Sequence, residues 1–360
     1  MTILRDYQTE GAEYLATRRR AVVVSPAGSG KTIIAAAALS RVTTARKRDR
    51  PVRIGWLANT TEQVNQGRDA IALFPALADQ DVRLACAAAA TDWSDRDVLV
   101  VDECHHVSAL GWFEQVNRCA GARWGLTATP PTDPDAVRLF TDALGTVLTI
   151  ERSRVQQNLA RAVVRWLDHS DDGVRQAIDA AIAAELPRRQ RWWRGDPGQL
   201  WGQVAWQFVI DLGIVANGAR NQAAVAAATN SRPTLVLVNK VGHGQALAAA
   251  IPGARCCFSK MGAKLRREAL ADFTAGRCRC IVATSLADEG LDLPNAEVLV
   301  LVSGGRSKAR TEQRTGRVLR AFAGKPHGVI YDFRDTFHPL PAKHARVRGD
   351  LYQSLGYTIE

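Results

Sequence analysis

The sequence predicts an α/β protein with two tandem domains, each a parallel sheet flanked by helices, and a helical linker or insert between them. Short, continuously apolar runs alternate with alanine-rich stretches, which is typical of parallel strands covered by helices on both faces. The length of 360 residues fits two domains of about 150 residues each plus an insert. The alternation stops near residue 150 and resumes near residue 231, which predicts the two domain boundaries.

The elements of the first part of the chain follow in order from this pattern. Four buried strands of a first domain, residues 1–150, are expected at residues 21–25, 53–58, 98–101 and 123–127. A helix is expected over residues 32–40, directly after a glycine-rich turn. A helical linker or insert, residues 151–230, is expected from helix-period runs at residues 174–186, 200–216 and 219–228.

A second domain, residues 231–360, repeats the strand–helix rhythm. Its strands are expected at residues 235–239, 255–258, 280–284, 298–302 and 329–333. A short helical tail is expected over residues 342–356. The shared rhythm is consistent with one fold used twice.

Composition excludes several classes of protein. A hydrophobic content of 46% and a charged content of 23% are ordinary for a packed globular protein, which excludes disordered and collagen-like chains. No apolar run reaches the roughly 18 residues of a membrane span, and the N-terminus lacks the pattern of a signal peptide. We therefore expect a soluble, cytoplasmic protein. The seven cysteines include no Cys-x-x-Cys pair, which argues against a disulfide framework, a zinc ribbon or an iron–sulfur site.

Positive charge is concentrated in the last third of the chain. Residues 231–360 carry 20 basic and 11 acidic side chains, a net charge of +9, while the whole chain has a net charge of +11. A basic domain of this kind indicates a polyanionic partner such as nucleic acid. On charge alone, a protein that simply has a high isoelectric point is an equal alternative.

Residues 25–32, with the sequence Ser-Pro-Ala-Gly-Ser-Gly-Lys-Thr, follow a strand and open a helix, as a phosphate-binding loop does. Gly28 and Gly30 let the backbone amides turn towards phosphate oxygens, and the start of the helix adds a favourable field. Lys31 can reach the β- and γ-phosphates, and the Thr32 hydroxyl can bind Mg²⁺. Ser25 replaces the glycine with which this pattern usually begins. The expected nucleotide-binding residues of the loop are Pro26, Ala27, Gly28, Ser29, Gly30, Lys31 and Thr32.

Asp102 and Glu103 end the strand expected at residues 98–101. A carboxylate at the tip of a neighbouring strand is where Mg²⁺ lies beside a bound triphosphate, so Asp102 is expected to hold the metal. Glu103 is placed to activate a water molecule. Together with the phosphate loop, this pair predicts a nucleoside triphosphatase that uses Mg²⁺. The alternative is an acidic strand end that caps a helix.

Further motifs follow in a fixed order along the chain. Residues 4–8 (Leu-Arg-Asp-Tyr-Gln) precede the phosphate loop, and residues 59–64 (Asn-Thr-Thr-Glu-Gln-Val) follow it. After residues 102–105 (Asp-Glu-Cys-His) come the motifs at residues 127–130, 283–294 and 313–320. In this order and spacing the chain resembles a superfamily 2 helicase of the DExH-box type, in the compact branch shared by excision-repair helicases and small bacteriophage helicases. The resemblance extends from residue 4 to about residue 335.

This resemblance implies two RecA-like domains and an ATP-dependent helicase or translocase that moves 3′ to 5′ on DNA without sequence specificity, with RNA as the alternative substrate. It implies that Gln8 reads adenine with Arg5 beside it. Arg317 and Arg320 share one face of an expected helix, and the resemblance implies that they act as arginine fingers on the γ-phosphate. Further implied ATP-binding residues are Glu289, Gly290 and Asp292. The implied nucleic-acid contacts are Thr60, Thr61, Thr284 and Ser285, and the implied coupling residues are His105, Thr127, Thr129 and Gln313.

Several alternatives stay open. A nucleic-acid-stimulated ATPase that clamps or remodels a complex without separating strands needs the same motifs. A binding module with an inactive ATPase is a third alternative. Glu289 and Asp292 have helix capping as an equal alternative role. No motif Ib can be identified between residues 83 and 92.

The segment at residues 187–197 matches no motif of this family. It places Trp192 and Trp193 among four arginines between two prolines, which argue against one continuous helix. Such a segment is either an exposed tip that separates strands by stacking on bases or a segment whose indoles pack onto a domain. Of the other tryptophans, those expected in the core are Trp56, Trp124, Trp201 and Trp206.

Overall fold

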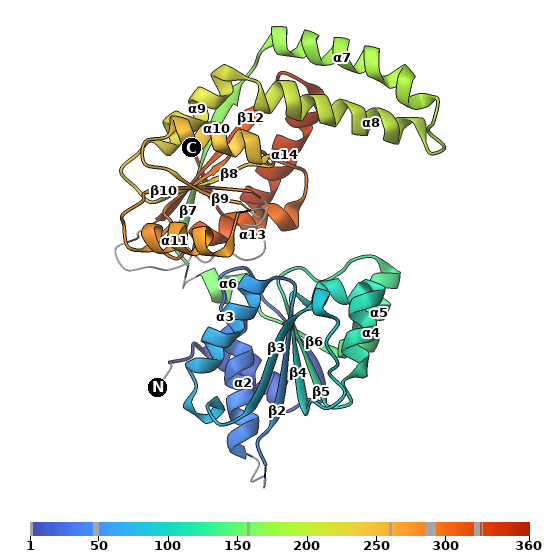
Figure 1. The fold of residues 1–360 in the computed structure, drawn as a ribbon, viewed down its shortest axis with the longest axis vertical. Helices are drawn as coiled ribbons and strands as arrows, with labels where there is room; N and C mark the ends of the chain where they lie inside the picture. The colour runs from blue at the N-terminus through green and yellow to red at the C-terminus, as the bar shows by residue number, and fades with distance from the viewer. Residues whose placement is uncertain are drawn as a thin grey trace. The chain divides into compact units, whose positions relative to one another are not determined.

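The computed structural model describes residues 3–45, 50–156, 159–258, 261–284, 293–319, 325 and 327–360. Within these ranges the chain forms two compact units, the first ending at Leu159 and the second beginning at Ala160. In each unit a parallel sheet is flanked by helices, so the expected fold class is confirmed (Figure 1). None of the described helices combines the length and the apolar composition needed to cross a bilayer.

The first unit is built around a six-stranded parallel sheet in the order β3-β2-β4-β5-β1-β6. Its strands are β1 (Arg20–Val24), β2 (Arg53–Ala58), β3 (Asp81–Cys86), β4 (Val98–Asp102), β5 (Ala122–Thr127) and β6 (Thr146–Thr149). Its helices are α1 (Asp6–Ala16), α2 (Lys31–Ala45), α3 (Thr61–Ala72), α4 (Leu110–Arg118), α5 (Pro134–Leu144) and α6 (Arg152–Gln156). Short 3₁₀ turns lie at Pro75–Leu77, Ala87–Ala89 and Cys104–Ser108.

Two hydrophobic cores hold these helices against the two faces of the sheet (Figure 1). Side chains alternate across β1, so Val23 packs in the core with α1, α2 and α3, whereas Val22 packs in the core with α4 and α5. Trp56 and Trp124 are buried in the first of these cores, as expected. Because the central strands are buried on both faces, they read as continuous apolar runs in the sequence.

The second unit is built around a seven-stranded parallel sheet in the order β13-β7-β12-β11-β8-β10-β9. Its strands are β7 (Arg161–His169), β8 (Thr234–Leu237), β9 (Arg255–Cys257), β10 (Cys280–Ala283), β11 (Val298–Leu301), β12 (His327–Asp335) and β13 (Thr358–Ile359). Its helices are α7 (Asp172–Gln190), α8 (Pro197–Phe208), α9 (Gly218–Ala228), α10 (Val241–Ala250), α11 (Ala263–Thr274), α13 (Lys308–Val318) and α14 (Pro339–Ser354), with a π-helix at Val209–Val215.

The chain that joins the two sheets differs from the helical linker expected over residues 151–230. It contains β7, which pairs along its whole length with β12 of the second sheet. The sequence hides this strand because Arg161, Arg165 and Asp168 interrupt its apolar residues. The helical insert is the stretch from α7 through the π-helix, and α9 packs into the core of the second sheet.

The helices α7 and α8 form a hairpin that projects from the rest of the second unit (Figure 1). Helix α7 continues through Pro187, so the tip of the hairpin is shorter than the expected segment of residues 187–197. Trp192 at this tip is 82% exposed, which excludes packing of its indole onto a domain. The neighbouring Trp193 instead donates a hydrogen bond from its indole nitrogen to Asp196 O at 3.0 Å.

The hairpin buries aliphatic residues rather than its tryptophans. Ile178 and Ile182 of α7 pack with Ala205 of α8 in one hydrophobic cluster. Trp201 is 40% exposed, and Trp206 is half-buried. The expectation of a core position is therefore wrong for Trp201, because a two-helix hairpin buries only the facing sides of its helices, whereas Trp206 packs against the hydrophobic cluster without being fully buried.

Candidate active site

The phosphate loop follows β1 and leads directly into α2. Gly28 and Gly30 have φ angles of 81° and 82°, in the left-handed region that glycine adopts without steric cost. A Cβ atom at Gly30 would lie 2.6 Å from Gln8 Nε2, so this position has no room for a side chain. The two glycines therefore produce the tight curl that the sequence predicts.

The loop carries buried polar groups that fit a phosphate. Ser25 and Ser29 are fully buried, and neither hydroxyl has a hydrogen-bond partner within the described part of the chain. The Lys31 ammonium donates to Ser25 O at 3.4 Å, close to the limit for a hydrogen bond. Because a buried hydroxyl without a partner costs free energy, a loop with these groups and a lysine is suited to an anion. Thr32 lies half-buried in the first turn of α2.

The start of α1 supports the loop from the side. Gln8 accepts a hydrogen bond from Arg5 N at 3.0 Å and donates from Nε2 to Ser29 O at 2.9 Å. The Tyr7 hydroxyl donates to the same carbonyl at 3.1 Å and accepts from Arg5 Nη1 at 2.9 Å. Gln8 and Arg5 thus lie beside the loop, although adenine recognition by Gln8 stays a prediction. Sequence reasoning missed Tyr7, for which its position next to Gln8 was the available signal.

Two carboxylates lie at the carboxyl end of β4, at the same edge of the sheet as the loop. The strands β4, β5 and β1 are parallel neighbours, so their carboxyl ends meet. Asp102, the last residue of β4, is 5% exposed. Glu103 follows it with φ 46° and ψ 49°, a left-handed conformation that costs a non-glycine residue roughly 1–2 kcal/mol. Such strained positions cluster at functional sites.

The environment separates the two carboxylates electrostatically. Burial raises the pKa of Asp102 to about 7, and the Glu103 carboxylate adds to this rise while Lys31 opposes it. Burial also acts to raise the pKa of Glu103, but the close contact with His105 and the charges of Lys31, His105 and His106 outweigh it and lower that pKa. Glu103 therefore stays ionised and can accept a proton. A divalent cation beside Asp102 would favour its charged form, so this residue fits a metal ligand.

His105 joins two of the sequence motifs. Its Nδ1 lies 3.1 Å from Thr127 Oγ1 and 3.4 Å from Glu103 Oε2. Thr127 Oγ1 also accepts a hydrogen bond from Thr129 N at 3.1 Å. The structure thus brings together three of the four expected coupling residues through one imidazole and one hydroxyl. The fourth, Gln313, lies half-buried on α13 of the second unit.

The expected nucleic-acid contacts lie at ends of elements. The Thr60 hydroxyl caps α3 by accepting from Gln63 N at 3.3 Å. Thr61 is exposed in the first turn of that helix. Thr284 directly follows β10 and is 5% exposed. Contact of these residues with nucleic acid stays a prediction.

Helix α13 carries the arginines of the motif at residues 313–320. Arg314 and Arg317 are 7% and 9% exposed, and Arg314 donates to Ser303 O at 3.4 Å. Burying a guanidinium is costly unless it is paired, so this face of the helix is not a solvated surface. The role of Arg317 at ATP stays a prediction. The expected site residues that lie outside the described part of the chain are Ser285, Glu289, Gly290, Asp292 and Arg320.

Comparison with known proteins connects each unit to a family. The family model described as type III restriction enzyme, res subunit, matches residues 2–82, and the one described as helicase conserved C-terminal domain matches residues 223–322. A putative DNA 3′-5′ helicase Rad25 from Haloarcula marismortui is 26% identical over 363 residues, which cover 92% of this chain and 53% of that protein. The DNA 3′-5′ translocase XPB2 from Sulfurisphaera tokodaii is 22% identical over 353 residues, covering 88% of this chain and 78% of that protein.

The two family models and these relatives support a superfamily 2 helicase. The resemblance predicted from the motifs is thereby confirmed. A solved structure, the helicase domain of Hef from Pyrococcus furiosus, matches with a TM-score of 0.57 at 15% identity, over 96% of this chain and 98% of that chain. At this identity the likeness supports the tandem RecA-like fold alone. The chain spans about half the length of the Haloarcula protein, of which it covers 53%.

Proposed function

We propose that the chain is an ATP-dependent DNA translocase that moves 3′ to 5′ and separates strands as a helicase. The observation that carries the proposal is the edge of the first sheet, where the phosphate loop, Asp102 and Glu103 lie at the ends of β1 and β4. ATP hydrolysis needs a loop that holds the phosphates, a carboxylate that binds the metal and a second, ionised carboxylate that accepts a proton. The loop, Asp102 and Glu103 are suited to these three roles. The names of the two relatives support DNA as the substrate and 3′ to 5′ as the direction.

The residues of this site would divide the chemistry among them. Lys31 would contact the β- and γ-phosphates, while Thr32 and Asp102 would hold Mg²⁺. Mg²⁺ bound with ATP neutralises charge on the phosphate oxygens. The Glu103 carboxylate, next to His105, would accept the proton of the attacking water. Buried hydroxyls and a partly engaged lysine in the loop fit this assignment.

Further residues complete the proposed function. Arg317 and Arg320 of the second unit would stabilise charge on the γ-phosphate. Hydroxyl side chains at helix starts and strand ends are suited to strand phosphates and read no base edges, so binding is expected to be sequence-nonspecific. The proposed phosphate contacts are Thr60, Thr61, Thr284 and Ser285.

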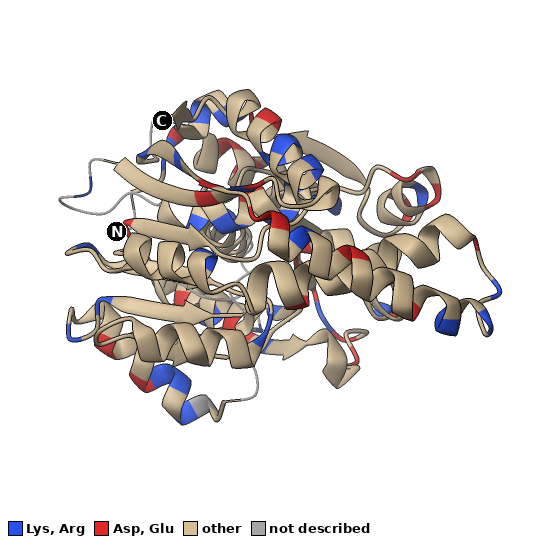
Figure 2. Ribbon diagram, turned by 90° about the horizontal axis from the view of Figure 1, so that it is seen from above, with Lys and Arg blue, Asp and Glu red and all other residues tan. Residues whose placement is uncertain are grey.

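One feature favours strand separation over the rival function, an ATPase that clamps or remodels a complex. A helicase needs a wedge that enters between two strands. The α7–α8 hairpin projects from the second unit, and Trp192 at its tip is 82% exposed (Figure 1). Arginine residues gather at this tip as well, at positions 188, 189, 191 and 194 (Figure 2). An exposed indole beside positive charge is suited to stacking on a base while holding a phosphate.

Steady-state ATP hydrolysis by the full chain tests the proposal, with single-stranded DNA, duplex DNA, forked DNA and RNA as separate stimulators. We expect stimulation by single-stranded and forked DNA, and unwinding of forks that carry a 3′ tail but not of forks that carry only a 5′ tail. Glu103→Gln is the matched control because it keeps the size of the side chain and removes the base. Hydrolysis that none of the four nucleic acids stimulates would refute the proposal, and stimulation without unwinding would favour the clamp.

A further inference from the structure

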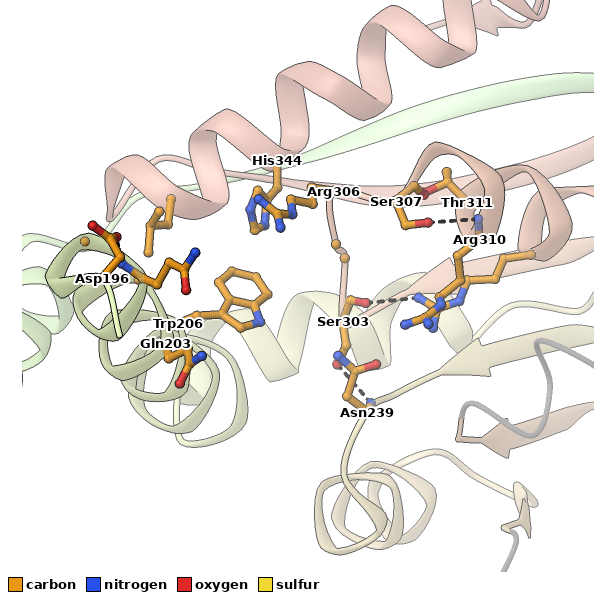
Figure 3. A pocket seen from close by; sticks show the side chains of 17 residues that line it. Asp196, Gln203, Trp206, Asn239, Ser303, Arg306, Ser307, Arg310, Thr311 and His344 are labelled. Atoms are coloured by element: carbon orange, nitrogen blue, oxygen red, sulfur yellow. Dashed lines mark hydrogen bonds between the residues drawn. The ribbon is translucent and has the colours of Figure 1, made fainter. Parts of the chain in front are cut away.

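A cavity of about 840 Å³ lies within the second unit and is lined by none of the expected site residues (Figure 3). On one side it is bordered by α8 through Gln203 and Trp206, and on the other by the start of α13 and the segment before it, through Ser303 and Arg310. His344 of α14 lies at its edge. We name this cavity, with these five residues, the β8–β11 pocket.

The strand order of the sheet marks this position as a binding site. From β8 the chain builds β9 and β10 on one side and then returns to build β11 and β12 on the other side. In open α/β sheets, ligands bind beyond the carboxyl ends of the strands at the point where this direction reverses. Asn239 lies just beyond the end of β8 and Ser303 just beyond the end of β11, and the Ser303 hydroxyl accepts a hydrogen bond from Asn239 N at 3.2 Å.

The lining of the β8–β11 pocket is positively charged. It includes Arg306, Arg310 and Arg314, and the first two are exposed. The one carboxylate among its lining residues, Asp196, accepts a hydrogen bond from Gln199 N at 2.8 Å and so caps α8. Three guanidinium groups against one carboxylate favour an anionic ligand, and exposed arginines suit a phosphate.

The pocket also offers a partner for a nucleobase. The half-buried Trp206 ring lies 4.5 Å from the His344 ring between centroids, at an interplanar angle of 61°. Burial, followed by the neighbouring positive charges, lowers the pKa of His344 to about 4, so its imidazole is neutral at neutral pH. His344 Nδ1 is buried and has no hydrogen-bond partner within the described ranges. An indole face, a neutral imidazole and the Gln203 amide together suit a base, which stacks and forms hydrogen bonds at once.

A buried ion pair fixes the wall between β11 and α13. Arg348 binds Asp332 through Nε at 2.7 Å and Nη2 at 3.0 Å, and its Nη1 donates to Gly305 O at 3.1 Å. A Cβ atom at Gly304 would lie 2.6 Å from Arg348 Nη1, whereas one at Gly305 would meet nothing within 4 Å. The glycine pair thus lets the wall lie against the guanidinium and leaves space beside Gly305. These buried contacts hold the wall of the cavity in place at Gly304 and Gly305.

We propose that the β8–β11 pocket accepts one nucleotide of a single-stranded nucleic acid, with the base against Trp206 and the phosphate against Arg306 and Arg310. The inference rests on the proposed function, because it adds the pocket to the path of the bound strand. Thr284, an expected strand contact, follows β10, and β10 is the parallel neighbour of β8. The carboxyl ends of these strands share one edge of the sheet, so a strand at Thr284 lies on the same edge as the pocket.

Gly202 offers a way to place a side chain in the part of the pocket beside α8 without disturbing its walls. It lines the cavity from α8, and a Cβ atom there would meet nothing within 4 Å. Because leucine favours a helix more than glycine does, Gly202→Leu is expected to keep the fold, which the melting temperature and circular dichroism check. Gly242→Leu is the matched control, since a Cβ at Gly242 of α10 also meets nothing within 4 Å and this residue does not line the pocket.

Binding of fluorescein-labelled oligo-dT to the full chain, followed by anisotropy, tests the proposal. Gly202→Leu is expected to raise the Kd for oligo-dT roughly tenfold or more, since the new leucine side chain would keep the base from stacking on Trp206. Gly242→Leu is expected to bind like the parent. Arg306→Gln gives a second, independent measurement at an exposed position, and is expected to lower the slope of log K against log salt by about 0.7, the value for one phosphate on a single strand.

The outcomes separate this proposal from the proposed function. If oligo-dT stimulates ATP hydrolysis but Gly202→Leu and Arg306→Gln keep the parental Kd and salt slope, the pocket proposal is overturned and the proposed function stands. Thymidine monophosphate and inorganic phosphate serve as competing probes. If thymidine monophosphate binds the parent as tightly as oligo-dT and Gly202→Leu loses only that binding, the pocket holds a free nucleotide and the proposal is wrong. If oligo-dT neither binds the parent nor stimulates hydrolysis, both proposals fail.

Discussion

Replacing Gln8 by alanine separates two roles of one side-chain amide. The sequence predicts that Gln8 reads adenine, whereas the structure shows its amide bound to Arg5 N at 3.0 Å and to Ser29 O at 2.9 Å. An amide offers two donors and two acceptor lone pairs. Within the described part of the chain these contacts use one of each, which leaves one N–H and one lone pair for a base. Gln8 can therefore support the loop and read adenine at the same time.

The structure gives a magnitude for each role. Gln8 is 7% exposed, and a buried hydrogen bond contributes about 1 kcal/mol, so Gln8→Ala is expected to lower the free energy of unfolding by about 2 kcal/mol. A base edge left without a partner costs roughly 1–3 kcal/mol. The preference for ATP over GTP should therefore narrow by roughly 5- to 150-fold, since about 1.4 kcal/mol corresponds to tenfold in affinity.

The matched control is Tyr7→Phe, because the Tyr7 hydroxyl donates to the same Ser29 carbonyl at 3.1 Å but reads no base. This variant is expected to lose about 1 kcal/mol of stability and to keep the parental preference for ATP. Urea unfolding measures the stability of both variants, and binding of ATP and GTP measures the preference. If Gln8→Ala kept the parental ratio of ATP to GTP affinity and differed only in stability, Gln8 would be a loop support and the adenine assignment would be wrong.

Three further predictions address the catalytic residues, the hairpin tip and a buried histidine. Lys31→Ala should abolish ATP turnover, whereas Glu103→Gln should bind ATP like the parent in a nucleotide titration and turn over roughly 10²- to 10⁴-fold more slowly; parental turnover in Glu103→Gln would exclude it as the base. Trp192→Ala should reduce fork unwinding while single-strand-stimulated hydrolysis and the melting temperature hardly change, since the side chain is 82% exposed; normal unwinding would eliminate the wedge. Burial, together with the charge of Arg220, lowers the pKa of His243 to about 4 from its ordinary 6.5. As the pH falls, this histidine therefore takes up a proton in the unfolded chain before it does so in the folded chain. Stability should therefore be complete above pH 6.5 and fall by up to about 3 kcal/mol towards pH 4, and His243→Gln should flatten this part of the pH profile of unfolding.

The positions of the phosphate loop and of the two carboxylates could be predicted from the sequence. In both cases the residues come directly after a continuous apolar run, which marks a buried strand. The loop follows Val24, and Asp102 follows Val101, so the sequence alone locates the carboxyl ends of two buried strands. Strands that read as continuous apolar runs are expected to be parallel and covered on both faces. The prediction that loop and carboxylates meet at one edge follows from this topology.

Other strands could not be predicted from continuous apolar runs, and the physical reason is the same for all of them. The burial of β7 and of the edge strands β3, β6 and β13 is incomplete, so polar residues interrupt them and no continuous apolar run appears. Contacts between segments escaped as well. The contact of His105 with Thr127 and that of Gln8 with Ser29 join residues more than 20 positions apart, and they depend on side-chain positions that periodicity does not contain.

The β8–β11 pocket shows which kind of site leaves no trace in a sequence. Taken singly, Trp206 reads as a core residue and Arg310 as part of a solvated helix face, and neither reading is unusual. Both line the pocket because the strand order places β11 beside β8 and because α8 lies on the other side of the cavity from the segment after Ser303. The phosphate loop forms a motif because its chemistry lies in eight consecutive residues, from Ser25 to Thr32. Chemistry spread over α8, α13, α14 and the ends of two strands forms none. A search by motif therefore finds the ATP site of this chain, whereas of the pocket it finds only Arg314, within the motif at residues 313–320. For the same reason the decisive variant places a side chain at Gly202 and does not remove a signature residue.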